Sequence, residues 1–345
     1  GLGHHRLRPL QTTAVRDPDA GDAVEVAVNS HGLRGPEVAV PKPPGVYRVL
    51  CLGDETVLGP QLPESLALPA QLKEFLQART ALRVEVLNAG LPGGCPLLAW
   101  LRLRHSLLGL QPDLIVLHVD MTDVADDRCY RRRTRVDRAD VPIACVHPSL
   151  GEAGSERDWW RDLRVTALLA QGLGLVGPTG AAPTADEPAA ATAWLRDHPE
   201  EWGPHVEQSL TPIEAIRDAA AGAGAALVVS TCPQPWQVSL EASAGPGVRE
   251  AAGVAPGAVL TSRAPFEAIT AFAESRGVAC CDASAAFGQS PDASRLYFRN
   301  APQLSREGHL LYARILGEFI ASRVPVFGGP GNSSGIPGAT VTFGD

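Results

Sequence analysis

The sequence predicts an α/β protein with three layers, in which helices cover both faces of a five-stranded parallel sheet. Short apolar runs of strand length alternate along the chain with segments whose apolar residues recur at helical spacing. Strands that alternate with helices pair in parallel through right-handed crossovers, which place helices on both faces of the sheet. The predicted strands are Tyr47–Leu52, Val84–Asn88, Leu114–Val119, Ala226–Thr231 and Val278–Asp282.

The helices between these strands carry start and stop signals. Thr211 to Glu214 reads T-P-I-E, which predicts a capping box with proline at the first helical position. Gly277 ends one helix, and Ser305 caps the last one. The predicted helices are Leu62–Ala78, Pro96–Leu110, a helix from Thr211 to near Gly222 or Gly224, Pro265–Arg276, and a last helix from Ser305 to Ser322.

One large domain over residues 46–325 is predicted, with shorter segments at both ends. Residues 1–45 form a β extension, with a strand at Val24–Val28 and a stiff proline-rich linker. Residues 126–209 form a long insertion between the third and fourth strands, where lids and cleft walls are common. Residues 326–345 form a Gly/Pro-rich tail without a packed core.

Composition excludes some classes of function. A net charge of −8 and a pI near 5.6 argue against a general nucleic-acid binder, and the basic run at 131–135 lies among acids and predicts a solvated loop. No window predicts a membrane span. The compartment stays open, with an extracytoplasmic location expected if a leader or anchor precedes Gly1.

The cysteines predict neither a zinc site nor a redox pair. The chain has seven cysteines and no C-x-x-C pair, and nothing in the sequence calls for a metal or another cofactor. Cys129 and Cys145 flank a polar loop suited to a disulfide, and the sequence leaves their pairing open. The other cysteines of the predicted strands are most simply small hydrophobic residues.

Four sequence blocks resemble those of the SGNH (GDSL-like) hydrolases, a family of lipases and acylhydrolases. Residues 49–56, V-L-C-L-G-D-E-T, resemble the first block, where the strand ends in Gly-Asp-Ser and the serine is the nucleophile; Glu55 holds that position. Residues 88–93 resemble the second block, whose last glycine, here Gly93, donates an N–H to the oxyanion hole. Residues 112–123 resemble the third block, with Thr122 at the position of the oxyanion asparagine.

The last block, residues 296–309, holds the base and acid of the family's catalytic triad. Gln303 stands at the histidine position, and Asn300 and Ala301 stand at the two candidate positions of the acid. The blocks imply the family's flavodoxin-like fold, with strand order 2-1-3-4-5. Ser-His-Asp catalysis needs an activated hydroxyl, a base and an orienting carboxylate, and all three positions are replaced.

The substituted site has several interpretations. Glu55 is expected to be ionised, to accept backbone N–H groups and to hydrogen-bond Gln303. Asp120 and Asp123 follow the third strand and Trp236 follows the fourth, so all three are candidates for lining a cleft. Paired carboxylates such as Glu55 and Asp120 also suit glycan hydrolysis, and oxygen clusters such as Glu55, Asp120 and Asp123 can bind a hard cation, although nothing in the sequence fixes a ligand spacing. In the plainer alternative, Asp123 caps a loop, Asp120 is solvated and His118 faces a helix.

Two functions follow from this resemblance. The favoured one is a non-catalytic module, a pseudoenzyme, that binds a glycan, an acyl group or a protein in the old active-site cleft. The alternative is an active GDSL-like esterase or O-deacetylase, or a carboxylate-dependent glycan hydrolase that uses Glu55 and Asp120.

Overall fold

The central sheet has five parallel strands, and their order is β4-β3-β5-β8-β9. The structure is a computed structural model that describes residues 3–146, 202–245 and 247–328. Counted along the core, this order is 2-1-3-4-5, so the predicted topology is confirmed. The strands are β3 (Val46–Gly53), β4 (Arg83–Gly90), β5 (Leu114–His118), β8 (Ala226–Thr231) and β9 (Ala279–Asp282).

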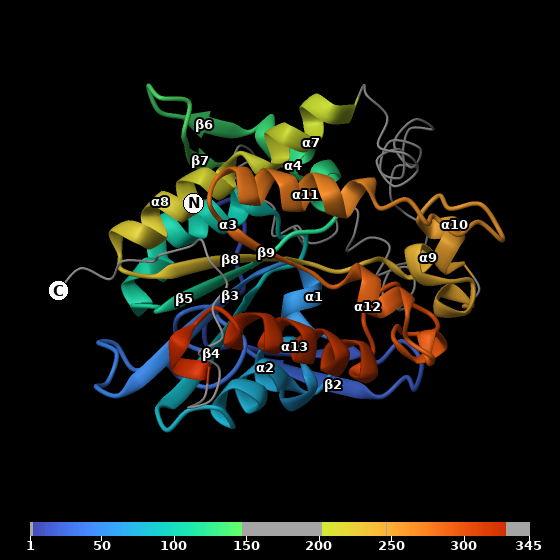
Figure 1. Cartoon of the computed structure of the whole chain (residues 1–345), viewed down its shortest axis with the longest axis horizontal. Coiled ribbons are helices and arrows are strands. Elements are labelled where there is room, and N and C mark those ends of the chain that lie inside the picture. Colours follow the sequence, from blue (N-terminus) through green and yellow to red (C-terminus); the bar gives the residue numbers. More distant parts are fainter. Residues whose placement is uncertain (1–2, 147–201, 246, 329–345) are drawn as a thin grey trace, which may run out of the picture.

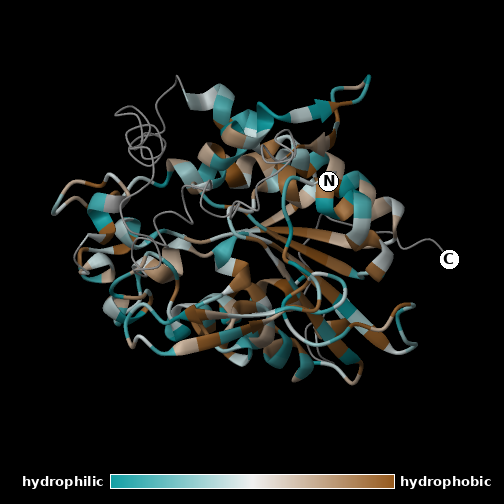
Figure 2. Cartoon of the chain, turned by 180° about the vertical axis from the view of Figure 1, so that it is seen from behind, coloured by the Kyte–Doolittle hydropathy of each residue, from teal (hydrophilic) through white to brown (hydrophobic). Residues whose placement is uncertain are grey.

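Helices cover both faces of the sheet, as the alternation of strands and helices predicted. α3 (Pro96–Arg102), α8 (Pro212–Gly222) and α11 (Ala264–Ser275) lie on one face, and α2 (Leu68–Gln77) and α13 (Arg306–Ala321) lie on the other (Figure 1). Leu50 and Leu52 of β3 pack into the first core, and Val49 and Cys51 pack into the second. Both faces of each strand are therefore apolar, and Figure 2 shows the central strands as strongly hydrophobic.

Shorter elements complete the described chain. Two antiparallel pairs lie outside the main sheet: β1 (Thr12–Arg16) with β2 (Ala23–Ala27), and β6 (Thr134–Val136) with β7 (Pro142–Cys145). The remaining α-helices are α1 (Glu55–Leu58), α4 (Asp123–Arg131), α7 (Gly203–Leu210), α9 (Pro235–Val238), α10 (Val248–Ala251) and α12 (Ser284–Gly288). A π-turn follows α3 at Leu103–Leu107, and 3₁₀ turns lie at Glu64–Leu66, Leu108–Leu110, Glu241–Ser243, Ala293–Arg295 and Pro325–Phe327.

Helix caps were predicted with mixed success. Ser305 caps α13 as expected, because its side chain accepts the N–H of Gly308. The capping box at Thr211 is wrong: Thr211 is itself helical, and its hydroxyl donates to the carbonyl of Gln208. α7 runs almost directly into α8, so no free helix end exists there for a side chain to cap.

Local sequence signals also missed some structure. The β1 strand was not among the predicted strands, and the basic run is solvent-exposed at Arg132, Arg133 and Arg135, as expected, but it spans the end of α4, a turn and the start of β6 rather than one loop. Arg131 ends α4 and donates two hydrogen bonds to Asp127, at 2.7 and 2.8 Å, and Thr134 begins β6. These short elements gain their partners from contacts that a single sequence does not show.

Buried side chains attach the N-terminal segment to the core. Arg34 is only 3% exposed, and its guanidinium donates to the carbonyls of Leu58, Gly59 and Leu62. These carbonyls belong to α1 and to the turn that follows it. The segment before β3 thereby holds the turn directly after Glu55 in place.

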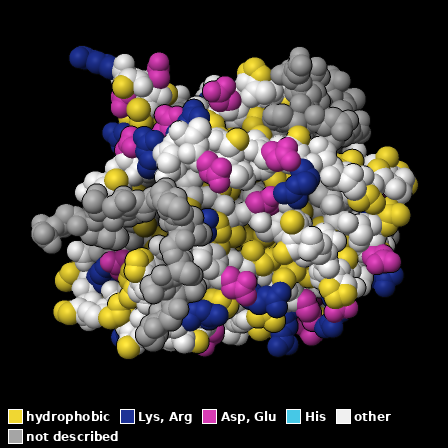
Figure 3. Space-filling model, viewed as in Figure 1, with side chains coloured by type: hydrophobic (Ala, Val, Ile, Leu, Met, Phe, Trp, Pro, Cys, Tyr) yellow, Lys and Arg dark blue, Asp and Glu magenta, His cyan; other side chains and the backbone are white. Residues whose placement is uncertain are grey.

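Some of the predicted segments consist of residues that the structure does not describe. Residues 147–201 of the predicted insertion and nearly all of the tail lie there, and the domain boundaries stay predictions. Cys145 is buried and reduced, with its thiol 3.4 Å from the carbonyl of Tyr130, so it is not bonded to Cys129. Over the described ranges, no helix has the length and apolarity to cross a membrane. Acidic and basic side chains are interspersed on the face in Figure 3.

Candidate functional site

Gly53 lets β3 end close against β5. A Cβ on Gly53 would lie 2.6 Å from Cγ2 of Val57 and 2.9 Å from Cβ of His118, so no larger residue fits without a shift. The chain then turns into α1, and Oδ1 of Asp54 accepts the N–H of Thr56 at 2.9 Å. Asp54 and Glu55 are thereby placed at the carboxyl edge of the sheet, where ligands of parallel sheets bind.

The carboxyl group of Glu55 accepts a hydrogen bond from the backbone N–H that the family resemblance assigns to the oxyanion hole. Both carboxylate oxygens lie 3.2 Å from the backbone nitrogen of Gly93, which donates to them, and Glu55 is only 4% exposed. Burial raises the pKa of Glu55 well above its ordinary value, and the carboxyl groups of Asp54 and Asp126 raise it further. The expected N–H acceptance is confirmed, whereas the raised pKa of Glu55 acts against the expectation that this carboxyl group stays ionised.

Thr122, the second expected oxyanion donor, is also engaged. Its hydroxyl and its backbone N–H both donate to Oδ1 of Asp120 at 2.7 Å. Asp120 receives a further hydrogen bond at Oδ2 from the side chain of Gln234, at 2.8 Å. Asp120 is 1% exposed, so the interpretation of Asp120 as a solvated residue is wrong.

Five carboxyl groups are buried in this region: Asp54, Glu55, Asp120, Asp123 and Asp126. Burial and neighbouring acids raise the pKa of Asp54 to about 6 and that of Asp126 to about 8. The pKa of Asp123 is raised well above its usual range for the same reasons. Burial also acts to raise the pKa of Asp120, but His118 and the Thr122 donors outweigh it and the pKa is lowered.

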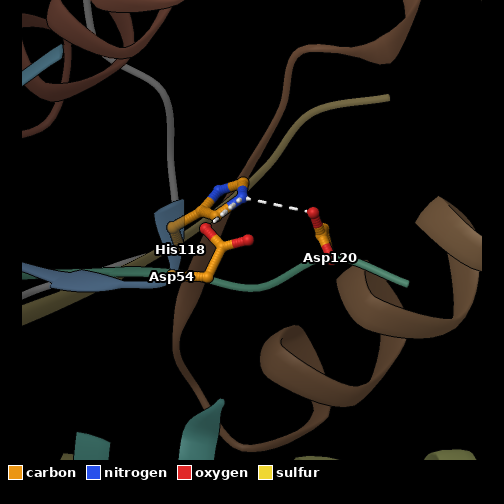
Figure 4. A group of neighbouring side chains, drawn as sticks. All are labelled: Asp54, His118 and Asp120. Atoms are coloured by element: carbon orange, nitrogen blue, oxygen red, sulfur yellow. Dashed lines mark ion pairs between the residues drawn. The ribbon is translucent and has the colours of Figure 1, made fainter. Parts of the chain in front are cut away.

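His118, the last residue of β5, faces these acids. Its Nδ1 lies 2.8 Å from the hydroxyl of Tyr312 on α13, which donates onward to Oγ of Ser230 at 2.9 Å. Its Nε2 lies 3.9 Å from Oδ1 of Asp54 and 3.8 Å from Oδ2 of Asp120 (Figure 4). Burial lowers the pKa of His118, but the two carboxylates outweigh this and the net pKa is raised. His118 therefore faces a helix, as the plainer alternative held.

The residues of the last sequence block at the acid and base positions of the triad carry no charge. Asn300 is exposed, and its N–H and side-chain amide donate to Oδ1 of Asp19 in the turn between β1 and β2. Ala301 is buried in a small apolar cluster. Oε1 of Gln303 is buried and has no hydrogen-bond partner among the described residues. No hydrogen bond joins Glu55 to Gln303 in the described structure, so that expectation is wrong.

The other candidates lie in the interior. Asp123 is 2% exposed, and its Oδ2 accepts the backbone N–H of Asp120 at 3.1 Å, which makes it a loop cap as the plainer alternative held. Trp236 is 4% exposed and packs in the larger core, and its role as a cleft wall stays a prediction. Sequence reasoning missed Gln234 and Tyr312. Gln234 follows the fourth strand and could have been found by its place at the sheet edge, but Tyr312 carries no such signal.

Solved structures with a similar chain course are lipolytic enzymes and an esterase. A lipase/acylhydrolase from Enterococcus faecalis is 11% identical, with a TM-score of 0.44, and the match covers 80% of this chain and 96% of that one. An acetylxylan esterase from Geobacillus stearothermophilus is 12% identical, with a TM-score of 0.41 and coverage of 79% and 94%. A GDSL-like lipase from Bacteroides thetaiotaomicron is 13% identical, with a TM-score of 0.38 and coverage of 82% and 91%.

Comparison by sequence adds no relatives: no family model and no curated protein matches this chain. The fold itself is defined by the strand order and the pairing registers described above. The resemblance to the SGNH hydrolases is carried by the four sequence blocks. In the structure, Glu55, Gly93 and Thr122 of those blocks follow the ends of β3, β4 and β5, at the carboxyl edge of the central sheet.

Proposed function

We propose that this protein is a non-catalytic, SGNH-like module that binds a glycan, an acyl group or a protein at the old active-site edge. One observation carries the proposal. The two groups that correspond to oxyanion donors, the N–H of Gly93 and the hydroxyl of Thr122, donate to the buried carboxyl groups of Glu55 and Asp120. Acyl transfer needs such donors aimed at the developing oxyanion, and here they are already engaged.

The remaining chemistry of an esterase is absent from the corresponding positions. Glu55 offers no hydroxyl, and the amide of Gln303 is no base near neutral pH. Removing the catalytic residues of such an enzyme costs about 10⁴–10⁶ in turnover, so three substitutions together leave no ordinary triad. The carboxylate alternative is not favoured, because Glu55 and Asp120 are 4% and 1% exposed and both accept internal hydrogen bonds.

Ester turnover and active-site labelling test this proposal. The unmodified chain is expected to hydrolyse neither p-nitrophenyl acetate nor acetylated sugars above a heat-treated control. A fluorophosphonate is expected to leave residue 55 unlabelled, because a carboxyl group there provides no activated hydroxyl. Clear turnover by the unmodified chain would overturn the proposal: its loss in Glu55→Ala or Asp120→Asn would support the carboxylate-dependent alternative, and its persistence in both would place the chemistry elsewhere.

A restoration series makes the test sharper. Glu55→Ser with Gln303→His frees the N–H of Gly93 and supplies a nucleophile and a base, so labelling at residue 55 should appear only when both are present. Adding Ala301→Asp should raise the labelling rate, because a buried carboxylate fixes the imidazole tautomer. Asn300→Asp is the matched control: it adds the same group at an exposed position that hydrogen-bonds Asp19, and it should give no such gain.

A further inference from the structure

The group formed by Asp54, His118 and Asp120 has the donor set of a metal centre. One carboxylate oxygen of each aspartate and one ring nitrogen of the histidine all lie within 4.8 Å of one another. All three residues are buried, with exposures of 7%, 2% and 1% in chain order. Charged groups buried together in this way are normally paired or bound to metal ions.

Nε2 of His118 points to a ligand rather than to a partner in the protein. It is buried and has no hydrogen-bond partner in the described part of the chain, although the other ring nitrogen has one. Figure 4 shows both carboxylates on the Nε2 side of the ring. The distances of 3.8 and 3.9 Å are too long for hydrogen bonds, so neither carboxylate is paired with Nε2, and in the neutral imidazole its lone pair is available to an ion.

The hydrogen bond at Nδ1 sets the tautomer that a metal requires. With the hydroxyl of Tyr312 assigned as the donor to Ser230, that hydroxyl accepts from His118, and the proton of a neutral imidazole then lies on Nδ1. Nε2 then carries a free lone pair directed at the two carboxylates. Metal-binding histidines are held in the same way, with the second ring nitrogen hydrogen-bonded.

The two aspartates are oriented as well. Asp120 accepts from Thr122 at Oδ1 and from Gln234 at Oδ2, and Asp54 accepts from the N–H of Thr56. These contacts fix the carboxylates while leaving lone pairs for an ion. Three oriented donors from the ends of two neighbouring strands form a preorganised set.

We propose that Asp54, His118 and Asp120 bind one divalent transition-metal ion of the Zn²⁺ or Co²⁺ class. One imidazole nitrogen with two carboxylate oxygens suits such ions, whereas Ca²⁺ takes six to eight oxygen ligands. Donors at about 2.0–2.2 Å from one zinc ion in a tetrahedral arrangement lie roughly 3.4 Å apart. The two separations from His118, 3.8 and 3.9 Å, need a small inward movement, and the oxygens of the two aspartates, within 4.8 Å of one another, must also approach. The side chain of Asp54, at 10% exposure, is the most accessible of the three.

No sequence spacing announces this site. Asp54 follows the first core strand, whereas His118 and Asp120 end the third, and only the pairing of β3 with β5 brings them together. Asp120 belongs both to this site and to the argument for the loss of esterase activity, but metal binding is measured without a substrate, so the two proposals are tested independently.

The test uses the full chain, stripped with EDTA and then titrated with Zn²⁺ by calorimetry and with Co²⁺ by visible absorption. One ion per chain is expected, with Co²⁺ bands typical of a nitrogen- and oxygen-ligated site, and Mg²⁺ and Ca²⁺ should bind far more weakly. His118→Gln and Asp120→Asn should each weaken binding by more than about tenfold. Asp126→Asn is the matched control, because it removes another buried carboxyl group but none of the three donors; it should bind nearly as tightly as the wild type.

Tyr312→Phe keeps all three donors and removes only the hydroxyl that holds Nδ1, so it should weaken binding by about tenfold without loss of the fold. This variant keeps the proposal falsifiable if His118→Gln does not fold. Equal Zn²⁺ affinity in the wild type and His118→Gln, or in the wild type and Tyr312→Phe, would overturn the proposal. Absence of stoichiometric binding to the wild type would also overturn it, and the group would then be a histidinium between two carboxylates.

Discussion

At the amino end of the central sheet, Arg48 is fully buried, and every contact it makes compensates its charge or its N–H groups. It donates to Glu85 at 2.8 and 3.0 Å and to the carbonyls of Leu110 and Ala39. At the carboxyl end, the buried carboxyl groups of Asp54 and Asp120 face His118, and Glu55, Asp123 and Asp126 are buried in the same region; among the described residues none of these five acids forms an ion pair with lysine or arginine. The charge of Arg48 at one end of the sheet is therefore compensated by Glu85, whereas the acids at the other end have no lysine or arginine partner among the described residues.

This difference separates stability from function. Buried charges are tolerated when they are paired and hydrogen-bonded, and otherwise they raise the free energy of the folded state. The amino end therefore fixes β3 against β4, while the acids of the carboxyl end lower stability wherever they ionise. Groups that cost stability at a ligand-binding edge are typical of functional sites.

The largest expected effect is at the amino end. Arg48→Met should lower the free energy of unfolding by about 3–5 kcal/mol, because Glu85 and two carbonyls lose a buried partner. Urea unfolding followed by circular dichroism measures this loss. Arg83→Ala is the control, because Arg83 contacts the same Glu85 from an exposed position and should cost less than about 1 kcal/mol. Equal losses in the two variants would contradict the claim that the buried contacts of Arg48 stabilise the amino end of the sheet.

A smaller effect is expected from pH at the carboxyl end. The folded-state pKa of Asp126 is raised from 3.8 to about 8 and that of Asp54 to about 6, so the unfolded chain loses these protons first as pH rises. Ionisation of these two acids in the folded chain should therefore lower stability between about pH 4 and pH 8, whereas the lowered pKa of buried His309 acts in the opposite direction between about pH 3 and pH 6.5. Asp126→Asn cannot ionise and should be more stable than the wild type at pH 8, by about 2–4 kcal/mol, with little difference at pH 4.

Urea midpoints in EDTA across this pH range would measure the effect without bound metal. Asp218→Asn, an exposed substitution, controls for the loss of one negative charge. A stability gain of Asp126→Asn over the wild type that does not increase between pH 4 and pH 8 would contradict the assignment of Asp126 as an uncompensated acid.

The sequence predicted the sheet well because its strands are long apolar runs. The register of β3 with β4 and β5 brings Gly53, Gly90 and the end of β5 to one edge, so Glu55 and Gly93 could be placed together in advance. The sequence blocks also predicted that Glu55 would accept backbone N–H groups. The hydrogen-bond partners of His118 and Asp120 could not be predicted from the sequence, because Tyr312 and Gln234 come from distant elements.

Burial was the other quantity that the sequence did not reveal. Aspartates after a strand are commonly solvated, and Asp120 was expected to be so in one alternative, yet α13 and the residues after β8 enclose it and His118. The capping box at Thr211 failed for a similar reason, since the preceding helix extends to it. Local patterns identify the elements, but enclosure depends on how those elements pack.

The backbone amide of Gly93 gives the most direct test of the claim that Glu55 fills the place of the oxyanion. Its ¹H and ¹⁵N chemical shifts can be followed by NMR from pH 3 to pH 9, with Glu55→Gln used to identify the signal and to remove the titration. The account predicts that the Gly93 amide titrates with a midpoint above 4.5, because burial raises the pKa of Glu55, and that Glu55→Gln abolishes the titration. A Gly93 amide that exchanges freely with solvent, or one whose shift is the same in Glu55→Gln at every pH, would contradict it.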